Sequence, residues 1–189
     1  MRESDSKKLD SMFLERWSPR AFSSEPISGE DLNTLFEAAR WSPSCFNEQP
    51  WHYVYAKSER DLARFQSILV EANQVWASHA PVLVIAFSKN QFAHNNKANR
   101  WADFDSGAAW MSLTLQANKL GLHCHGMGGF DQDKAYQITN VDADKYTAIC
   151  VIAIGKMIPP DTLPPDLQEK EIPSNRKPIA DFISEGKMS

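Results

Sequence analysis

The chain has 189 residues, which is enough for one domain with a sizeable hydrophobic core. Hydrophobic residues make up 42% and aromatic residues 11% of the sequence, as is typical of a packed globular protein. The net charge of -4 and the pI of about 5.7 argue against a general nucleic-acid-binding protein, because such proteins present a basic face. We expect a single domain over residues 1–189 that binds no nucleic acid.

The cysteines, the N-terminal residues and the apolar runs indicate the cellular compartment of the protein. Three cysteines without a C-x-x-C pair argue against a zinc ribbon or a disulfide framework, so a reducing compartment is expected. The first nine residues are polar and charged, unlike a secretory signal. The longest apolar runs, Ala80–Phe87 and Ala148–Ile154, are too short to cross a bilayer. We expect a cytoplasmic protein with no membrane attachment.

Capping pairs and hydrophobic spacing predict the elements of the first half of the chain. Leu9, Met12 and Phe13 recur at helical spacing. A serine followed three residues later by an aspartate, as at Ser28 and at Ser58, indicates a helix start. The predicted elements are a helix over Ser6–Glu15, a helix from Ser28 that stops near Trp41, a strand over His52–Ala56 and a helix from Ser58 that ends at Asn73-Gln74.

The second half of the chain alternates buried and polar segments. Pro81–Phe87 is rich in β-branched residues and predicts a buried strand. The polar stretch Ser88–Arg100 predicts a lid or a wall of a substrate site. Asp103–Leu120 is apolar around most of its circumference, so this helix is expected to be buried centrally or against a partner chain. A short strand, a glycine turn over 126–130, a helix from Asp131 to about Ile138 and a strand over 146–154 follow.

Beyond Gly155 the sequence changes in character. Six of the eleven prolines lie within residues 159–178, and no helical periodicity is present there. This composition predicts an extended C-terminal arm over about 156–189 instead of a second domain. Ile179–Ile183 is expected to form a short helix or strand near its end.

Arg16-Trp17-Ser18-Pro19-Arg20 is the first candidate binding segment. Arg16 and Arg20 bracket the hydroxyl of Ser18, and Pro19 stiffens the backbone between them. Arginine offers a planar fork of donors that never loses its charge, so the pattern suits a phosphate or another flat, oxygen-rich anion. An exposed basic helix end, favourable to the helix dipole, would have the same pattern.

The loop between the predicted helix and strand is the second candidate segment. Pro43 and Pro50 bound it, and Ser44, Asn47 and Gln49 are small polar residues within it. A loop of this kind leaves backbone donors free to face a ligand. A purely structural turn is the alternative.

Two other chemistries have weaker support. His123 and His125 are two residues apart on a predicted strand, so both rings share one face, but no third ligand is evident and we expect no metal site. Cys45 would need a base beside it to act as a nucleophile, and only His52 is close in sequence.

Five segments in order resemble the FMN-dependent nitroreductase family over residues 10 to 180. They are Glu15–Phe22, Trp41–Trp51, Asn73–Pro81, Gly126–Asp131 and the tail around Arg176. The resemblance implies an α+β nitroreductase-like fold, with a central, mostly antiparallel sheet flanked by helices. It also implies an intertwined homodimer with an extended C-terminal arm and FMN sites at the subunit interface.

The resemblance also implies a role for individual residues. Arg16 and Arg176 would bind the FMN phosphate, with Ser18 and the Trp17 backbone beside it. Arg20 would approach the N1–C2=O side of the flavin ring, where a cation tunes the redox potential. The other implied FMN contacts are Asn73 at the pyrimidine edge, Met127, Gly128 and Gly129 near O4 and N5, and Pro43, Ser44, Cys45, Asn47 and Gln49 from the other subunit.

The implied reaction needs no catalytic side chain, because the flavin carries the chemistry. NAD(P)H would reduce FMN, and an electron-poor acceptor such as a nitroaromatic or a quinone would reoxidise it in a ping-pong cycle. Phe92 and Trp101 are candidates for the acceptor side, or else ordinary packing residues. Ser174 and Asn175 stand where the family often has a lysine, so the role of Lys177 stays open. The alternatives are a flavin-storage or sensing protein, or a family variant that acts on enones, halogenated substrates or flavin itself.

Overall fold

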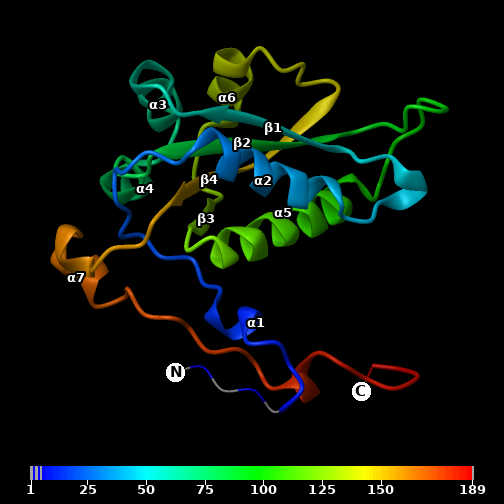
Figure 1. Cartoon of the computed structure of the whole chain (residues 1–189). Helices are drawn as coiled ribbons and strands as arrows, with labels where there is room; N and C mark the ends of the chain where they lie inside the picture. The colour runs from blue at the N-terminus through cyan, green and yellow to red at the C-terminus, as the bar shows by residue number, and fades with distance from the viewer. Residues whose placement is uncertain (1, 3, 5, 189) are drawn as a thin grey trace.

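The computed structural model describes residues 2, 4 and 6–188, and an antiparallel sheet forms the centre of the fold (Figure 1). Within these residues the sheet has four strands, and every neighbouring pair is antiparallel. In spatial order the strands are β1 (Trp51–Ala56), β2 (Val82–Lys89), β4 (Tyr146–Gly155) and β3 (His123–Met127). The predicted strands are confirmed, and the predicted α+β sheet with flanking helices is confirmed with them.

Helices cover both faces of this sheet (Figure 1). One face packs on α2 (Gly29–Arg40) and α5 (Ala102–Lys119), and the other packs on α3 (Glu59–Gln66), α4 (Glu71–Ala77) and α6 (Gln132–Thr139). Side chains alternate between the faces of a strand, so β2 contributes to both cores. Val82 and Val84 join the α2–α5 side, and Leu83, Ile85 and Phe87 join the other side. Burial on both faces explains the unbroken apolar run that predicted this strand.

The predicted helix starts at Ser28, Ser58 and Asp131 are correct. The hydroxyl Oγ of Ser28 accepts from the Asp31 backbone N–H at 2.9 Å, and Ser58 does the same for Asp61 at 3.2 Å. The carboxylate of Asp131 accepts from the Lys134 N–H at 3.0 Å at the start of α6. Each bond satisfies a backbone donor that the first helical turn leaves without an intrahelical partner.

The prediction of one helix from Ser58 to Asn73-Gln74 was wrong. The chain breaks between α3 and α4, where Val70 adopts an extended conformation with ψ 151°. The Val70 N–H donates to the Gly129 carbonyl at 3.1 Å, and Leu69 pairs with Phe130. This pairing with a distant segment takes the place of the intrahelical hydrogen bonds of a continuous helix. Asn73 therefore lies in the first turn of α4 instead of at a helix end.

Two further helix predictions need correction. The helix expected over Ser6–Glu15 is limited to α1 (Met12–Glu15). The central alternative for α5 was wrong, since Phe104 is 75% exposed and Met111 is 37% exposed in the single chain. The other alternative, cover by a partner chain, stays a prediction.

The arm leaves the sheet after β4, as expected. It contains short turns at η2 (Pro160–Thr162), α7 (Pro165–Gln168) and η3 (Ile179–Asp181), so only the first part of Ile179–Ile183 is helical. Figure 1 shows the arm, in orange to red, running past α1 and the N-terminal segment, away from the sheet. Among the described residues, none of the helices combines the length and the apolar character that crossing a bilayer requires.

Position 155, at the start of the arm, has room only for glycine. A Cβ at Gly155 would lie 2.9 Å from Pro81 Cδ and 3.0 Å from Phe22 Cδ1. We therefore expect Gly155→Ala to lower the free energy of unfolding by about 1–3 kcal/mol through overpacking. Urea unfolding measures this loss. Gly29→Ala is the control, because a Cβ there meets no atom within 4 Å, and equal stability of the two variants would contradict the packing argument.

Candidate functional site

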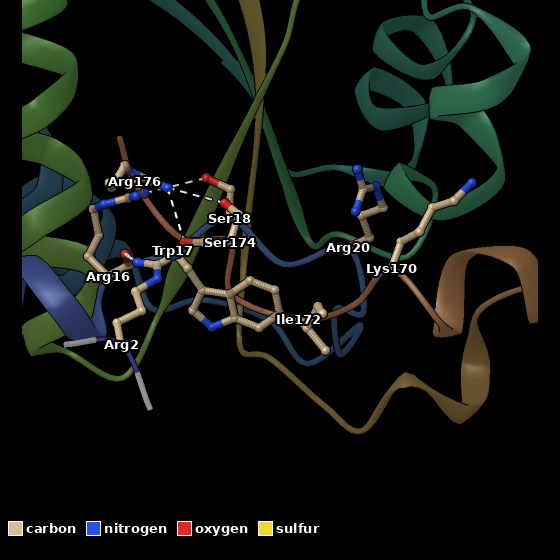
Figure 2. A pocket seen from close by; sticks show the side chains of 9 residues that line it. All are labelled: Arg2, Arg16, Trp17, Ser18, Arg20, Lys170, Ile172, Ser174 and Arg176. Carbon is tan, nitrogen blue, oxygen red and sulfur yellow. Dashed lines mark hydrogen bonds between the residues drawn. The ribbon is translucent and has the colours of Figure 1, made fainter. Parts of the chain in front are cut away.

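The two ends of the chain meet at a pocket of about 230 Å³ (Figure 2). Cationic side chains dominate its lining. The lining residues are Arg2, Arg16, Trp17, Ser18, Arg20, Lys170, Ile172, Ser174 and Arg176. The predicted binding segment 16–20 and the distant Arg176 therefore line one pocket.

Three guanidiniums gather at one end of the pocket. Arg2 Nη1 donates to the carbonyl oxygen of Arg16 at 2.8 Å and to that of Leu14 at 3.3 Å. Arg16 Nη1 donates to Ser18 Oγ at 3.4 Å, and Arg176 Nη1 donates to the Ser174 hydroxyl at 3.1 Å (Figure 2). Within the described part of the chain, no carboxylate forms an ion pair with any of the three.

This cluster carries an unbalanced positive charge. Burial lowers the pKa of Arg16, and repulsion from Arg176 lowers it further. Burial and repulsion from Arg176 and Arg16 lower the pKa of Arg2 in the same way. Guanidinium stays protonated despite such shifts, so the repulsion is relieved best by a bound anion. A phosphate dianion, which accepts several charge-assisted hydrogen bonds, fits this arrangement.

Arg20 has a different environment. In Figure 2 it lies with Lys170 apart from the three-arginine cluster. Its Nη1 is 3.7 Å from Glu171 Oε2, and Glu171 Oε1 accepts from the backbone N–H groups of Arg20 and Ala21. His125 Nδ1 lies 2.9 Å from the carbonyl oxygen of Pro19. The backbone that carries Arg20 is thus held by the arm on one side and by β3 on the other.

The contacts of His125 extend from this segment toward the predicted glycine turn. Its ring centroid is 4.5 Å from that of Trp76 on α4, and Asn73 lies one turn earlier on the same helix. Asn73 Nδ2 donates to the Gly129 carbonyl at 3.0 Å. A Cβ at Gly129 would lie 2.8 Å from Val70 Cγ2, so this position requires glycine.

The rest of the turn divides into exposed and buried parts. Gly128 is exposed, and a Cβ there would meet no atom within 4 Å. The Met127 side chain is 3% exposed and packs in the core, which leaves its backbone to meet a ligand.

The loop with Pro43, Ser44, Cys45, Asn47 and Gln49 lies elsewhere. Figure 1 places this segment, in cyan around residue 45, beyond the C-terminal end of α2, and none of the five residues lines the pocket. Its backbone is unusual, with positive φ at Phe46, Asn47 and Gln49. Ser44 Oγ accepts from the Gln49 N–H at 3.0 Å, and the buried Asp105 carboxylate accepts from the Cys45 N–H at 3.0 Å. A side-chain scaffold therefore maintains this strained loop.

Phe92 and Trp101, the acceptor-side candidates, have separate surroundings. Phe92 is buried and meets the exposed ring of Phe46 edge-on, with centroids 5.8 Å apart. Trp101 is exposed, and the Arg100 guanidinium stacks 4.5 Å from its centroid. Phe92 thus packs against the 43–49 loop, whereas Trp101 lies at the surface between Arg100 and Phe104.

The two weaker chemistries gain no support. The described residues contain no group of three His, Cys, Asp or Glu side chains that could hold a metal ion. The His52 ring packs on Tyr146, with centroids 5.6 Å apart.

Sequence reasoning missed Arg2, Lys170 and Glu171. Arg2 lies near the N-terminus within a polar stretch, and Lys170 and Glu171 belong to the proline-rich arm. No local spacing marks these residues, because only the meeting of the chain ends brings them to the pocket.

The geometry agrees with comparisons with known proteins. A family model described as "Nitroreductase family" matches residues 14–75 and 68–156. The chain belongs to the nitroreductase family. It is 30% identical over 166 residues to a Ralstonia nicotianae protein named "Putative NADH dehydrogenase/NAD(P)H nitroreductase", and the match covers 78% of this chain and 85% of that protein.

Solved structures of similar proteins have the same fold. One, described as "The crystal structure of the oxidoreductase containing FMN", superposes with a TM-score of 0.94 at 41% identity and covers 100% of this chain and 96% of its own. A nitroreductase family protein from Clostridium difficile 630 superposes with a TM-score of 0.72 at 19% identity, covers 94% of this chain and 98% of its own, and supports the fold alone. The predicted family and fold are confirmed.

The uncompensated arginine cluster predicts stabilisation by anions. Inorganic phosphate at 100 times its Kd should stabilise the ligand-free protein by about 2.7 kcal/mol, seen as a rise in Tm. Arg16→Ala should reduce this rise relative to the variant's own phosphate-free Tm. Arg60→Ala, an exposed α3 residue outside the pocket, is the control. The same phosphate response in both variants would show that the pocket is not the anion site.

Proposed function

We propose that this protein is an FMN-dependent oxidoreductase that transfers electrons from NAD(P)H to an electron-poor acceptor such as a nitroaromatic or a quinone. The observation that carries the proposal is the convergence of Arg16, Ser18, Arg20 and Arg176 on one cationic pocket from both ends of the chain. The similar structure described as containing FMN, at 41% identity over the whole chain, supports the choice of cofactor.

The residues present fit the phosphate of FMN. Arg16 and Arg176 offer forked donors beside the Ser18 and Ser174 hydroxyls, and their mutual repulsion favours a doubly charged ligand. Arg2 adds a third guanidinium that the sequence did not predict. Its Nε is buried without a hydrogen-bond partner among the described residues.

Other residues fit the flavin ring. When bound, FMN would supply the redox chemistry, accepting a hydride from NAD(P)H and passing electrons on to the acceptor in a ping-pong cycle. Arg20 would place positive charge at the N1–C2=O side, and Asn73 would bind the pyrimidine edge. The Gly128 and Gly129 backbone would lie close to O4 and N5, with no Cβ to hold the ring away.

We propose that a homodimer completes each site. The 43–49 loop lies away from the pocket of its own chain, so Pro43, Ser44, Cys45, Asn47 and Gln49 would serve the partner's flavin. Exposed apolar residues on α5 and on the arm, which a partner chain would cover, support this arrangement. They include Phe104, Met111, Ile172, Ile179, Phe182 and Ile183. Trp101 would then contribute to the acceptor side.

Turnover tests the proposed function directly. The FMN-loaded protein should oxidise NADH or NADPH when given a nitroaromatic or quinone acceptor, and parallel initial-velocity lines should accompany the ping-pong cycle. Bound flavin that bleaches with neither nucleotide would instead favour a storage or sensing role. Protein that neither retains nor takes up FMN would refute the proposal.

Removal of the phosphate-binding cations should discriminate between two flavins. Arg176→Ala and, to a smaller degree, Arg2→Ala should weaken FMN binding more than riboflavin binding, because only FMN carries the phosphate. Loss of a charge-assisted hydrogen bond of about 1.5–3 kcal/mol corresponds to a roughly 10- to 150-fold higher Kd. Flavin fluorescence titration measures both affinities. Lys177→Ala determines whether that neighbour also binds the phosphate, and equal losses for FMN and riboflavin in Arg176→Ala would contradict the assignment.

A further inference from the structure

The proposed function gives no role to the buried carboxylate of Glu171. Glu171 lies on the C-terminal arm, yet its side chain is only 3% exposed. A buried carboxylate is costly unless donors and a counter-charge surround it. The surroundings of Glu171 therefore indicate what this residue does.

Its two oxygens have different partners. Oε1 accepts from two consecutive backbone N–H groups, those of Arg20 and Ala21, the latter at 2.9 Å. Oε2 has no hydrogen-bond partner among the described residues, and Arg20 Nη1 lies 3.7 Å from it. One carboxylate thus binds the backbone of Arg20 and also offsets the charge of its side chain, across 151 residues of sequence.

Neighbouring contacts tie the same segment to the start of the arm. The Ile158 N–H donates to the Ala21 carbonyl at 3.1 Å, and the Ser23 N–H donates to the Lys156 carbonyl at 2.9 Å. Phe22 pairs with Met157 as an isolated bridge. These bonds hold residues 21–23, whereas Arg20 itself is held from the arm by Glu171.

We propose that Glu171 is a positioning residue that fixes the Arg20 backbone and reduces the positive field that Arg20 exerts in the pocket. This inference rests on the proposed FMN site, because Arg20 there faces the flavin ring. A reduced flavin carries more negative charge than an oxidised one, so the field at Arg20 sets the flavin potential. The arm would thereby influence the cofactor through one carboxylate.

Two substitutions separate the two parts of this role. Glu171→Ala removes the acceptor, so the Arg20 and Ala21 amides should exchange hydrogen at least tenfold faster in the FMN-free protein. Glu171→Gln keeps an acceptor oxygen but removes the charge, so those amides should stay protected while the midpoint potential of bound FMN becomes more positive. Glu169→Gln is the matched control, since Glu169 is exposed on the same arm.

The outcomes are decisive for each part. Unchanged exchange in Glu171→Ala would refute the backbone clamp, and an unchanged potential in Glu171→Gln would refute the charge offset. If Glu169→Gln shifts the midpoint potential of FMN by the same amount, the shift comes from general surface charge. That result would also refute the proposal that Glu171 offsets the charge of Arg20. If the wild-type protein binds no FMN, the proposed function and the charge offset fail together, whereas the exchange comparison still decides the clamp.

Discussion

The cationic pocket depends on holding like charges together. Arg2, Arg16 and Arg176 repel one another, and no carboxylate within the described residues pairs with them. Neutral oxygen atoms accept hydrogen bonds from these guanidiniums. They are the Arg16 and Leu14 carbonyls for Arg2 and the Ser174 hydroxyl for Arg176. These acceptors orient the guanidiniums without cancelling their charge, so the pocket stays attractive to an anion.

Arg20 differs from these three arginines, because a carboxylate offsets its charge. Glu171 is the only acidic residue that forms an ion pair with a lining cation in the described part of the chain. The pocket therefore has a strongly positive end and a moderated end. A ligand with a dianionic phosphate and a neutral, electron-accepting ring matches this asymmetry, and FMN is such a ligand.

The sheet supports this pocket from its edge. β2 and β4 are buried at the centre and anchor both cores, while β3 is an edge strand. From that edge His125 reaches the Pro19 carbonyl, and the Gly128–Gly129 turn follows directly. The arm starts at the end of β4, beside Phe22. Neighbouring strands of one rigid sheet thus position the cation-bearing segment, the glycine turn and the arm relative to one another.

The sequence alone determined the features that depend on local chemistry. The Ser28, Ser58 and Asp131 caps acted as predicted, because a cap needs only residues three positions apart. The Arg16–Arg20 pattern predicted an anion site, and these residues do line one cationic pocket. The order of five short motifs was enough to indicate the family.

Only the tertiary structure decided which distant groups meet. The break at Val70 arises from pairing with Gly129, which overrides helical spacing over residues 58–74. Glu171 reaches Arg20 across 151 residues, and Arg2 reaches the pocket from the other end of the chain. Such contacts are set by how the chain ends fold back past the sheet, and the residues around each partner in the sequence carry no trace of them.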